Sequence, residues 1–241
     1  MEDVNEALAD MGREMAEEKV DQLAVKEALP MEKEDYIEKE AEIFTSALTE
    51  KYNAVIKQME IASAILSEEL QHLPDEERKR YEGELLEATK KLEEAKDISQ
   101  EIGESTFQAF LGIKDPTLVW IYNVGYKTQQ ENKLEEAEGI FQTLVLLSPM
   151  VRDYWMALGF VQRDREVYER AIESFSFASL LDPEHAPSRY QSAKVYLHQG
   201  EFEDALAELA VLEKIIKEQK LEDLKPHYNE LFNKARNRQM L

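Results

Sequence analysis

Cysteine is absent from this 241-residue chain, and glycine and proline are scarce, with eight and seven residues. Without cysteine the chain can form neither disulfides nor thiolate metal sites, which is compatible with a reducing compartment. The shortage of helix breakers, together with abundant Ala, Leu, Glu and Lys, favours an almost entirely helical structure. No alternating run long enough to build a sheet stands out, so we expect an all-α protein.

Long apolar runs and positive charge are also in short supply. No apolar run approaches the roughly 20 residues that a membrane span needs. The N-terminal MEDVNEALAD has neither the basic nor the apolar region of a signal peptide. With 51 acidic residues against 29 Lys and Arg, the formal net charge is −22. The electric field of this charge repels phosphate groups, so we expect no nucleic-acid partner. Together with the missing signal peptide and membrane span, it leads us to expect a cytoplasmic protein that does not insert into a membrane.

Signatures of catalysis and of metal or cofactor binding are missing. The four histidines are widely separated, and no H-x-x-x-H or H-E-x-x-H pair occurs. The chain has no G-x-G-x-x-G, Walker-type or G-x-S-x-G motif. Its carboxylates fall mostly on the polar faces of expected helices, where they do not converge on a pocket. We therefore expect no enzymatic activity, no cofactor and no metal ion.

The C-terminal half repeats itself with a period of 34 residues. Ala137, Ala171 and Ala205 recur at this spacing in similar acidic settings, and Pro149 and Pro183 follow the first two. A period of this length with recurring small and aromatic positions is typical of tetratricopeptide repeats (TPRs), each a pair of antiparallel helices. The expected repeats span 118–151, 152–185 and 186–219, and a helix over 221–238 is expected to cap the stack.

Small residues in the first helix of each repeat (helix A) are expected to face large residues in the second (helix B). Gly125 and Gly159 allow close approach, and Phe141 and Phe175 fill the space opposite. The third repeat has no terminal proline, so its helix B is expected to run on.

Helices A are expected to line a concave groove. By helical spacing, positions 2, 5, 9 and 12 of each helix A point into it. These positions hold Val119, Tyr122, Tyr126 and Gln129, then Asp153, Met156, Phe160 and Arg163, then Pro187, Tyr190, Lys194 and Leu197. All of them except Asp153 and Pro187 are predicted to form a peptide-binding site. The aromatic and apolar members suit an extended apolar peptide. Alternatively, these residues pack between repeats or against the N-terminal helices.

The N-terminal part divides into an acidic leader and a helical hairpin. Residues 1–30 carry a thin apolar stripe and high charge, typical of a disordered segment or a single helix. Residues 31–105 carry two one-sided apolar seams, over 34–70 and 76–102, joined by a tight turn at Pro74. An antiparallel hairpin and a coiled-coil dimerisation arm both fit this pattern.

Helix caps are expected at three places. Asp75 is expected to cap the second helix of the hairpin. Ser105 or Thr106 is expected to cap a short helix that ends at Gly112, where the TPR domain (106–241) begins. Asp115 is expected to cap the next helix, with a proline at its first position.

The short helix before the first repeat, the F-Q-x-L-x-x-L ending of that repeat and the S-F-S-F-A block in the second are more particular than a general TPR pattern. Three stretches carry a family resemblance. They are FQAFLGIKDPTLVWIYNVGYKTQQENKLEEAEGIFQTLVLLSP, YWMALGFVQRDREVYERAIESFSFASLLDP and PSRYQSAKVYLHQGEFEDALAELA. Over about residues 106–219 the chain resembles the class II chaperones of type III secretion, the CesD/SycD/LcrH family. The resemblance implies a bacterial chaperone that holds an apolar segment of a translocator or effector in its groove, keeping it soluble before export. It also implies a homodimer through N-terminal helices as one expected assembly.

The chain departs from that family in two respects. Residues 1–105 stand where the family has only a short segment, and Gln129 stands where an aromatic is common. The hairpin could extend the cargo surface, dimerise, fill the groove until cargo arrives or dock on a secretion apparatus. The alternative function is a TPR scaffold that joins folded partners through the groove and the hairpin.

Overall fold

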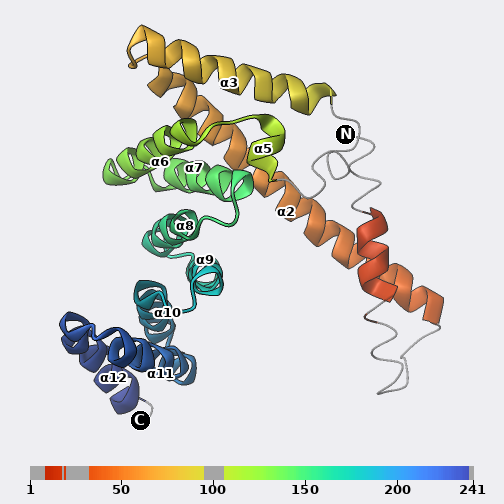
Figure 1. Ribbon diagram of the computed structural model, residues 1–241. Helices are drawn as coiled ribbons and strands as arrows, with labels where there is room; N and C mark the ends of the chain where they lie inside the picture. The colour runs from red at the N-terminus through yellow and green to blue at the C-terminus, as the bar shows by residue number, and fades with distance from the viewer. Residues whose placement is uncertain (1–8, 18, 20–32, 95–105, 239–241) are drawn as a thin grey trace. The chain divides into compact units, whose positions relative to one another are not determined.

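The computed structural model describes residues 9–17, 19, 33–94 and 106–238 (Figure 1). Every regular element in these ranges is a helix and no strand occurs among them, which confirms the all-α prediction. The chain forms two compact units, 1–57 and 58–241, so the division falls inside the long helix α2 (Lys33–Leu70). No helix in the described ranges is both long enough and apolar enough to cross a membrane.

The first unit holds a helical stretch, residues 9–17, against the start of α2. Gly12 is buried there, and a Cβ at this position would collide with the hydroxyl of Thr45. Arg13 forms an ion pair with Glu34 at 2.7 Å. The leader was expected to be disordered or a single helix, and its described residues are helical.

The second unit begins with the end of α2 and with α3 (Asp75–Glu94), which share an apolar core. The carbonyl of Pro74 accepts a hydrogen bond from the amide of Arg78 at 2.9 Å, so α3 already includes Asp75. The prediction that Asp75 caps this helix is therefore wrong by one residue. Its carboxylate still lies in the first turn, where it favours the helix dipole. Residues 95–102 of the expected helix lie outside the described residues.

The entry into the first repeat is held by side-chain caps. Thr106 Oγ1 accepts from the amide of Ala109 at 3.1 Å, and α5 (Phe107–Leu111) ends at Gly112 with φ 78°, as predicted. Helix α6 (Asp115–Gln130) starts after Lys114, so the prediction that Asp115 is its cap is wrong. Instead, the carboxylate of Glu84 in α3 accepts from the Lys114 amide at 2.9 Å and from Thr117 Oγ1 at 2.7 Å.

Three helix pairs then stack in sequence, as predicted for TPRs (Figure 1). They are α6 with α7 (Leu134–Leu147), α8 (Arg152–Asp164) with α9 (Tyr168–Leu181), and α10 (Ala186–Gln199) with α11 (Phe202–Gln219). The three helices B begin at positions 134, 168 and 202, which keeps the 34-residue period. Helix α11 runs on as expected, and a 3-10 turn (Glu222–Leu224) leads to the capping helix α12 (Lys225–Arg238).

The small-against-large packing of helices A and B is confirmed. A Cβ on Gly159 would lie 2.6 Å from the ring of Phe175, and one on Gly125 would lie 3.0 Å from the ring of Phe141. Both phenylalanines are fully buried. Glycine is therefore required at these two positions by the closeness of the opposite ring, since backbone conformation there is ordinary helix.

The turns between helices A and B follow a rule that the sequence did not reveal. Asn132, Glu166 and Gly200 occupy equivalent positions and all have positive φ, of 60°, 63° and 83°. Each repeat thus needs one left-handed residue at this turn, and only the third supplies the glycine that adopts it without strain.

The described part of the hairpin within the second unit packs on the first repeat. Tyr81 of α3 stacks on Trp120 of α6 with ring centroids 4.9 Å apart. Lys127 of α6 binds Glu69 of α2 at 2.7 Å. A Cβ on Gly139 of α7 would lie 2.6 Å from the carbonyl oxygen of Gln58, so α2 crosses α7 there. The domain boundaries expected near 30 and 105 fall outside the described residues and stay a prediction.

Candidate peptide-binding groove

Helices A form the walls of a pocket of about 290 Å³ on the concave side of the repeats. Side chains from α6, α8 and the start of α10 line it, with one from α7 beneath. The lining residues are Tyr122, Tyr126, Gln129, Phe141, Asp153, Met156, Ala157, Phe160, His185 and Pro187.

Half of the ten predicted site residues come together in this pocket: Tyr122, Tyr126, Gln129, Met156 and Phe160. Asp153 and Pro187, at position 2 of their helices, also line it. This part of the groove is walled by helices of all three repeats. Whether these side chains contact a peptide stays a prediction.

The other five predicted residues lie outside this pocket. Val119 is 56% exposed at the start of α6. Tyr190 and Leu197 pack in the C-terminal core, where Tyr190 meets His227 of α12 edge to face at 6.3 Å. Lys194 is exposed on α10. Tyr190 and Leu197 therefore pack against neighbouring helices, as in the alternative given for the predicted groove residues, although the helices they meet are C-terminal.

Arg163 is held at the edge of the groove by neighbours. Its guanidinium lies 5.2 Å from the ring centre of Phe160, donates to Gln191 Oε1 at 2.9 Å and binds Asp164 at 2.6 Å. Gln129 Nε2 donates to the same aspartate at 3.4 Å. These contacts fix the polar rim of the groove, with Gln129 joining the first repeat to the second and Gln191 joining the second to the third.

The aromatic floor of the groove is supported from behind. Tyr122 meets Phe141 edge to face at 5.6 Å and Tyr154 at 5.9 Å. Burial raises the pKa of the Tyr122 hydroxyl, with nearby Asp153 adding to the effect, so the side chain remains a neutral hydrogen-bond donor. Tyr126, by contrast, is 55% exposed and presents its ring to solvent.

His185 is a groove residue that sequence reasoning missed. It precedes α10 as its N-cap, outside the helical positions from which the groove was predicted. Its Nδ1 is buried without a hydrogen-bond partner among the described residues. Burial lowers the pKa of this imidazole, Arg152 lowers it further, and Asp182 and Asp153 act in the opposite direction. The ring therefore stands neutral in the wall of the groove, with one nitrogen unsatisfied.

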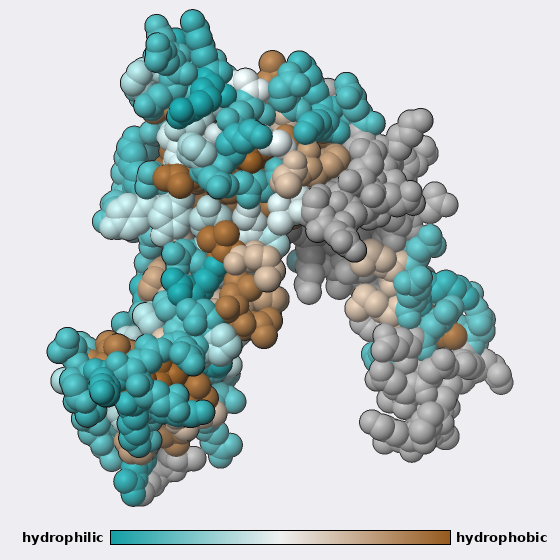
Figure 2. All heavy atoms as spheres, in the orientation of Figure 1, coloured by the Kyte–Doolittle hydropathy of each residue, from teal (hydrophilic) through white to brown (hydrophobic). Residues whose placement is uncertain are grey.

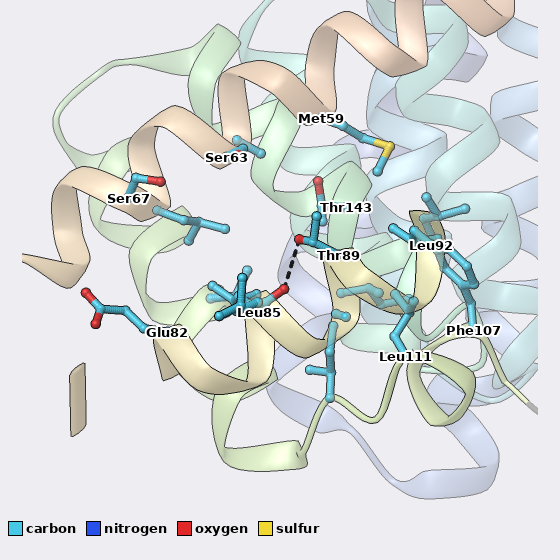
Figure 3. A pocket seen from close by; sticks show the side chains of 18 of the residues that line it. Met59, Ser63, Ser67, Glu82, Leu85, Thr89, Leu92, Phe107, Leu111 and Thr143 are labelled. Atoms are coloured by element: carbon cyan, nitrogen blue, oxygen red, sulfur yellow. Dashed lines mark hydrogen bonds between the residues drawn. The ribbon is translucent and has the colours of Figure 1, made fainter. Parts of the chain in front are cut away.

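A second, more apolar groove lies between the hairpin and the first repeat (Figure 3). Its volume is about 380 Å³. Met59 and Ser63 of α2, Leu85 and Leu92 of α3, and Thr143 of α7 point toward it. No predicted site residue lines it. In the described ranges, no three His, Asp or Glu side chains are placed to hold a metal ion.

The stacked helix pairs and the concave pocket define the class of protein, a TPR α-solenoid. A family model described as "Tetratricopeptide repeat" matches residues 164–221. These residues cover about the last two thirds of repeat two and all of repeat three.

Particular relatives lie among type III secretion proteins. The low calcium response locus protein H of Yersinia pseudotuberculosis is 26% identical over 133 residues, which are 55% of this chain and 76% of the relative. A type III secretion complex from Aeromonas hydrophila matches with a TM-score of 0.54 at 20% identity, covering 57% of this chain and 92% of that chain. PcrH of Pseudomonas aeruginosa, in complex with the chaperone-binding region of PopD, matches with a TM-score of 0.50 at 24% identity, covering 53% and 97%. The resemblance to the LcrH/SycD proteins is thereby confirmed.

Proposed function

We propose that this protein is a cytoplasmic type III secretion chaperone. It binds an extended apolar segment of a translocator or effector protein in its concave groove and keeps that protein soluble before export. The mechanism is binding without turnover. Apolar anchors of the cargo enter the pocket while the acidic surface keeps the complex dispersed in water.

The observation that carries this proposal is the aromatic pocket at the meeting point of the three repeats. Tyr126 and Phe160 offer broad rings that cost little side-chain entropy on binding. Asp153, Gln129 and the unsatisfied nitrogen of His185 stand beside them as polar groups able to fix a peptide backbone. The pocket volume of about 290 Å³ suits one or two apolar side chains of an extended peptide.

The relatives support the same reading. PcrH has been solved with the chaperone-binding region of PopD, and SycD of Yersinia enterocolitica is a translocator chaperone of the same fold. By this similarity, the expected partner is a secreted hydrophobic protein. Homodimers remain an expected assembly.

The test is co-expression with an aggregation-prone, membrane-active protein encoded nearby. The wild-type chain should move that protein into the soluble fraction and co-purify with it. Tyr126→Ala combined with Phe160→Ala should lose most of this effect while helicity by circular dichroism stays unchanged. Ile43→Ala, an exposed apolar change on α2, serves as the matched control. Full rescue by the double variant would sink the groove assignment.

The alternative is a TPR scaffold that joins folded partners, and the second apolar groove under the hairpin favours it. A scaffold should bind a folded partner and leave the solubility of a co-expressed translocator unchanged. The same co-expression experiment therefore separates the two functions.

A further inference from the structure

The convex side of the first two repeats carries an exposed apolar patch. Met150, Phe177 and Leu180 are 73%, 47% and 72% exposed, although large apolar side chains are usually buried. Figure 2 shows hydrophobic residues gathered over α8 and α9. We call Leu146, Met150, Val151, Trp155, Phe177 and Leu180 the back patch. None of the six lines the concave pocket, which is built by helices A.

The centre of the back patch is a fixed aromatic pair. Trp155 of α8 stacks on Phe177 of α9 with ring centroids 4.5 Å apart and nearly parallel planes. The indole nitrogen of Trp155 donates to the carbonyl of Pro149 at 2.7 Å, which fixes the ring in place. A preorganised, partly exposed Trp–Phe pair is typical of the anchors that dominate protein interfaces.

The same face of the first repeat is already covered by a helix. Counting one 34-residue period back, Glu173, Phe177 and Leu180 correspond to Gly139, Thr143 and Leu146. At Gly139 the backbone of α2 crosses α7, and Thr143 and Leu146 line the groove that α2 and α3 build over it (Figure 3). In this chain, the outer face of one helix B, α7, thus binds a crossing helix, α2.

Helix α8 packs on both α7 and α9, so the outer faces of these two helices B follow one another along the stack, and the back patch extends the intramolecular interface onto the second repeat. Leu146 belongs to both surfaces. Leu146 and Leu180 occupy equivalent positions on the helices B of the first two repeats. The second repeat differs in that its apolar residues at this face remain exposed to solvent.

An exposed acidic residue borders the back patch. Glu173 lies one turn before Phe177 on the same stripe of α9, exposed and with no ion-pair partner among the described residues. The cations of the second repeat are engaged elsewhere: Arg152 binds Asp153 and Asp182, and Arg165 and Arg170 bind Glu138. Glu173 thus leaves an uncompensated negative charge at the rim of the back patch.

We propose that the back patch is a docking surface for an amphipathic helix of a partner protein whose apolar stripe is flanked by Lys or Arg. The apolar stripe would cover Phe177 and Leu180 as α2 covers the first repeat, and the basic flank would meet Glu173. A second copy of this chain would bring another acidic rim to the site, at a formal net charge of −22 per chain, so the occupant is a different protein. An anionic lipid surface is disfavoured for the same reason.

Trp155 provides the reporter for the test. The chain holds only two tryptophans, and Trp120 lies buried under Tyr81, so the Trp120→Phe variant reports from Trp155 alone. The probe is a synthetic helical peptide of leucine and lysine with a one-sided leucine stripe. A peptide of the same composition in scrambled order and a leucine–glutamate peptide are the matched controls. Binding is read as a blue shift of Trp155 emission and protection from acrylamide quenching.

The lysine-flanked amphipathic peptide should bind saturably, and the two control peptides should bind at least about tenfold more weakly. Phe177→Ser with Leu180→Ser should raise Kd by about tenfold or more, because two apolar anchors are removed. Ile43→Ser, an equally exposed apolar residue outside the back patch, should leave Kd unchanged. Glu173→Lys should weaken binding of the leucine–lysine peptide and strengthen binding of the leucine–glutamate peptide. The groove variant Tyr126→Ala with Phe160→Ala should bind this peptide normally, so failure of the cargo groove and failure of the back patch are distinguishable.

Three results would overturn the proposal. Equal binding of the scrambled peptide, or of the Phe177→Ser, Leu180→Ser variant, would mean that charge attraction alone is measured. A wild-type dimer that this variant converts to a monomer would make the patch a contact between copies of the chain. A Trp155 blue shift with neutral phosphatidylcholine vesicles that the same variant abolishes would make the patch a lipid-binding surface.

Discussion

The absence of a side chain at Gly159 allows the two helices of the second repeat to pack closely. At Gly159 a Cβ would lie 2.6 Å from the ring of Phe175, which is fully buried and cannot move away. Gly83 of α3 is the opposite case, since a Cβ there meets nothing within 4 Å. The two glycines have the same ordinary helical backbone, so their substitutions isolate the packing effect.

Gly159→Ala should therefore destabilise the protein by about 1–3 kcal/mol through overpacking. Gly83→Ala should stabilise it by about 0.5–1 kcal/mol, because alanine favours the helix more than glycine. Urea unfolding followed by circular dichroism measures both. A loss of stability at Gly159→Ala no larger than about 0.5 kcal/mol would show that the A and B helices can separate freely.

His185 makes stability depend on pH in a defined direction. Burial lowers its pKa below that of an unfolded histidine, about 6.5, so below that pH the unfolded chain binds more protons than the folded chain. The contribution is complete above about pH 6.5 and is lost as the pH falls through the folded pKa. As the pH falls from about 7.5 to about 5.5, His185→Gln should lose less stability than the wild type.

The exposed His72 supplies the matched control for that experiment. His72→Gln should leave the wild-type dependence on pH in place, and the urea midpoint at each pH is the measurement. Identical pH profiles for the wild type and His185→Gln would show that folding does not lower the pKa of His185.

At the scale of elements, a buried carboxylate joins the first repeat to the second. Glu138 of α7 has no exposed side-chain surface and binds both Arg165 and Arg170, the latter at 3.0 Å. Gln162 of α8 donates to it at 3.3 Å and accepts from Ser174 of α9 at 2.7 Å. The equivalent positions of the next repeats are apolar, Ile172 and Leu206, so this polar junction is particular to the first two repeats.

Glu138→Ala should lower the free energy of unfolding by about 2–3 kcal/mol, since it leaves buried donors unpaired while the two arginines retain contact with water. Glu138→Gln, which keeps an acceptor, should cost less. Glu173→Ala, an exposed control, should cost less than about 0.5 kcal/mol. Equal unfolding curves for all three variants would show that the ion network contributes nothing to the junction.

The elements themselves were predictable because periodicity reports packing directly. The 34-residue period located the three helices B, and the glycine–phenylalanine pairs identified the close approach of helices A and B. Helix starts were less predictable: Asp75 and Asp115 have the chemistry of caps, yet the Glu84 carboxylate of a distant helix serves the start of α6. A cap that comes from another helix leaves no local signal.

Helical spacing also explains why five of the ten predicted site residues lie in one pocket. Helical spacing gives the face on which a residue lies, and it placed Tyr122, Tyr126 and Phe160 in one pocket. It does not say which part of a face a later element covers, and α12 packs on Tyr190 and Leu197. His185 lies in a loop, where no period applies, so its place in the wall emerged only from the folded structure.

At the scale of the whole molecule, the formal net charge of −22 destabilises the folded state through repulsion among carboxylates. The surface ion pairs, such as Lys90 with Glu87 and Lys234 with Glu230, are exposed and contribute little. Acidic residues outnumber basic ones by 51 to 29, so repulsion between uncompensated carboxylates outweighs these attractions.

Added salt should therefore stabilise this protein. Raising NaCl from about 20 to about 200 mM shortens the screening length to below about 10 Å, and the unfolding free energy should rise by about 1 kcal/mol. Urea midpoints at the two salt concentrations give the measurement. Replacing Glu82, Glu173 and Glu203, all exposed, by Gln removes three charges without removing a described ion pair, and should both raise stability at low salt and flatten its dependence on NaCl. A fall in stability with salt would instead mean that the ion pairs outweigh the net repulsion, since screening weakens whichever of the two dominates.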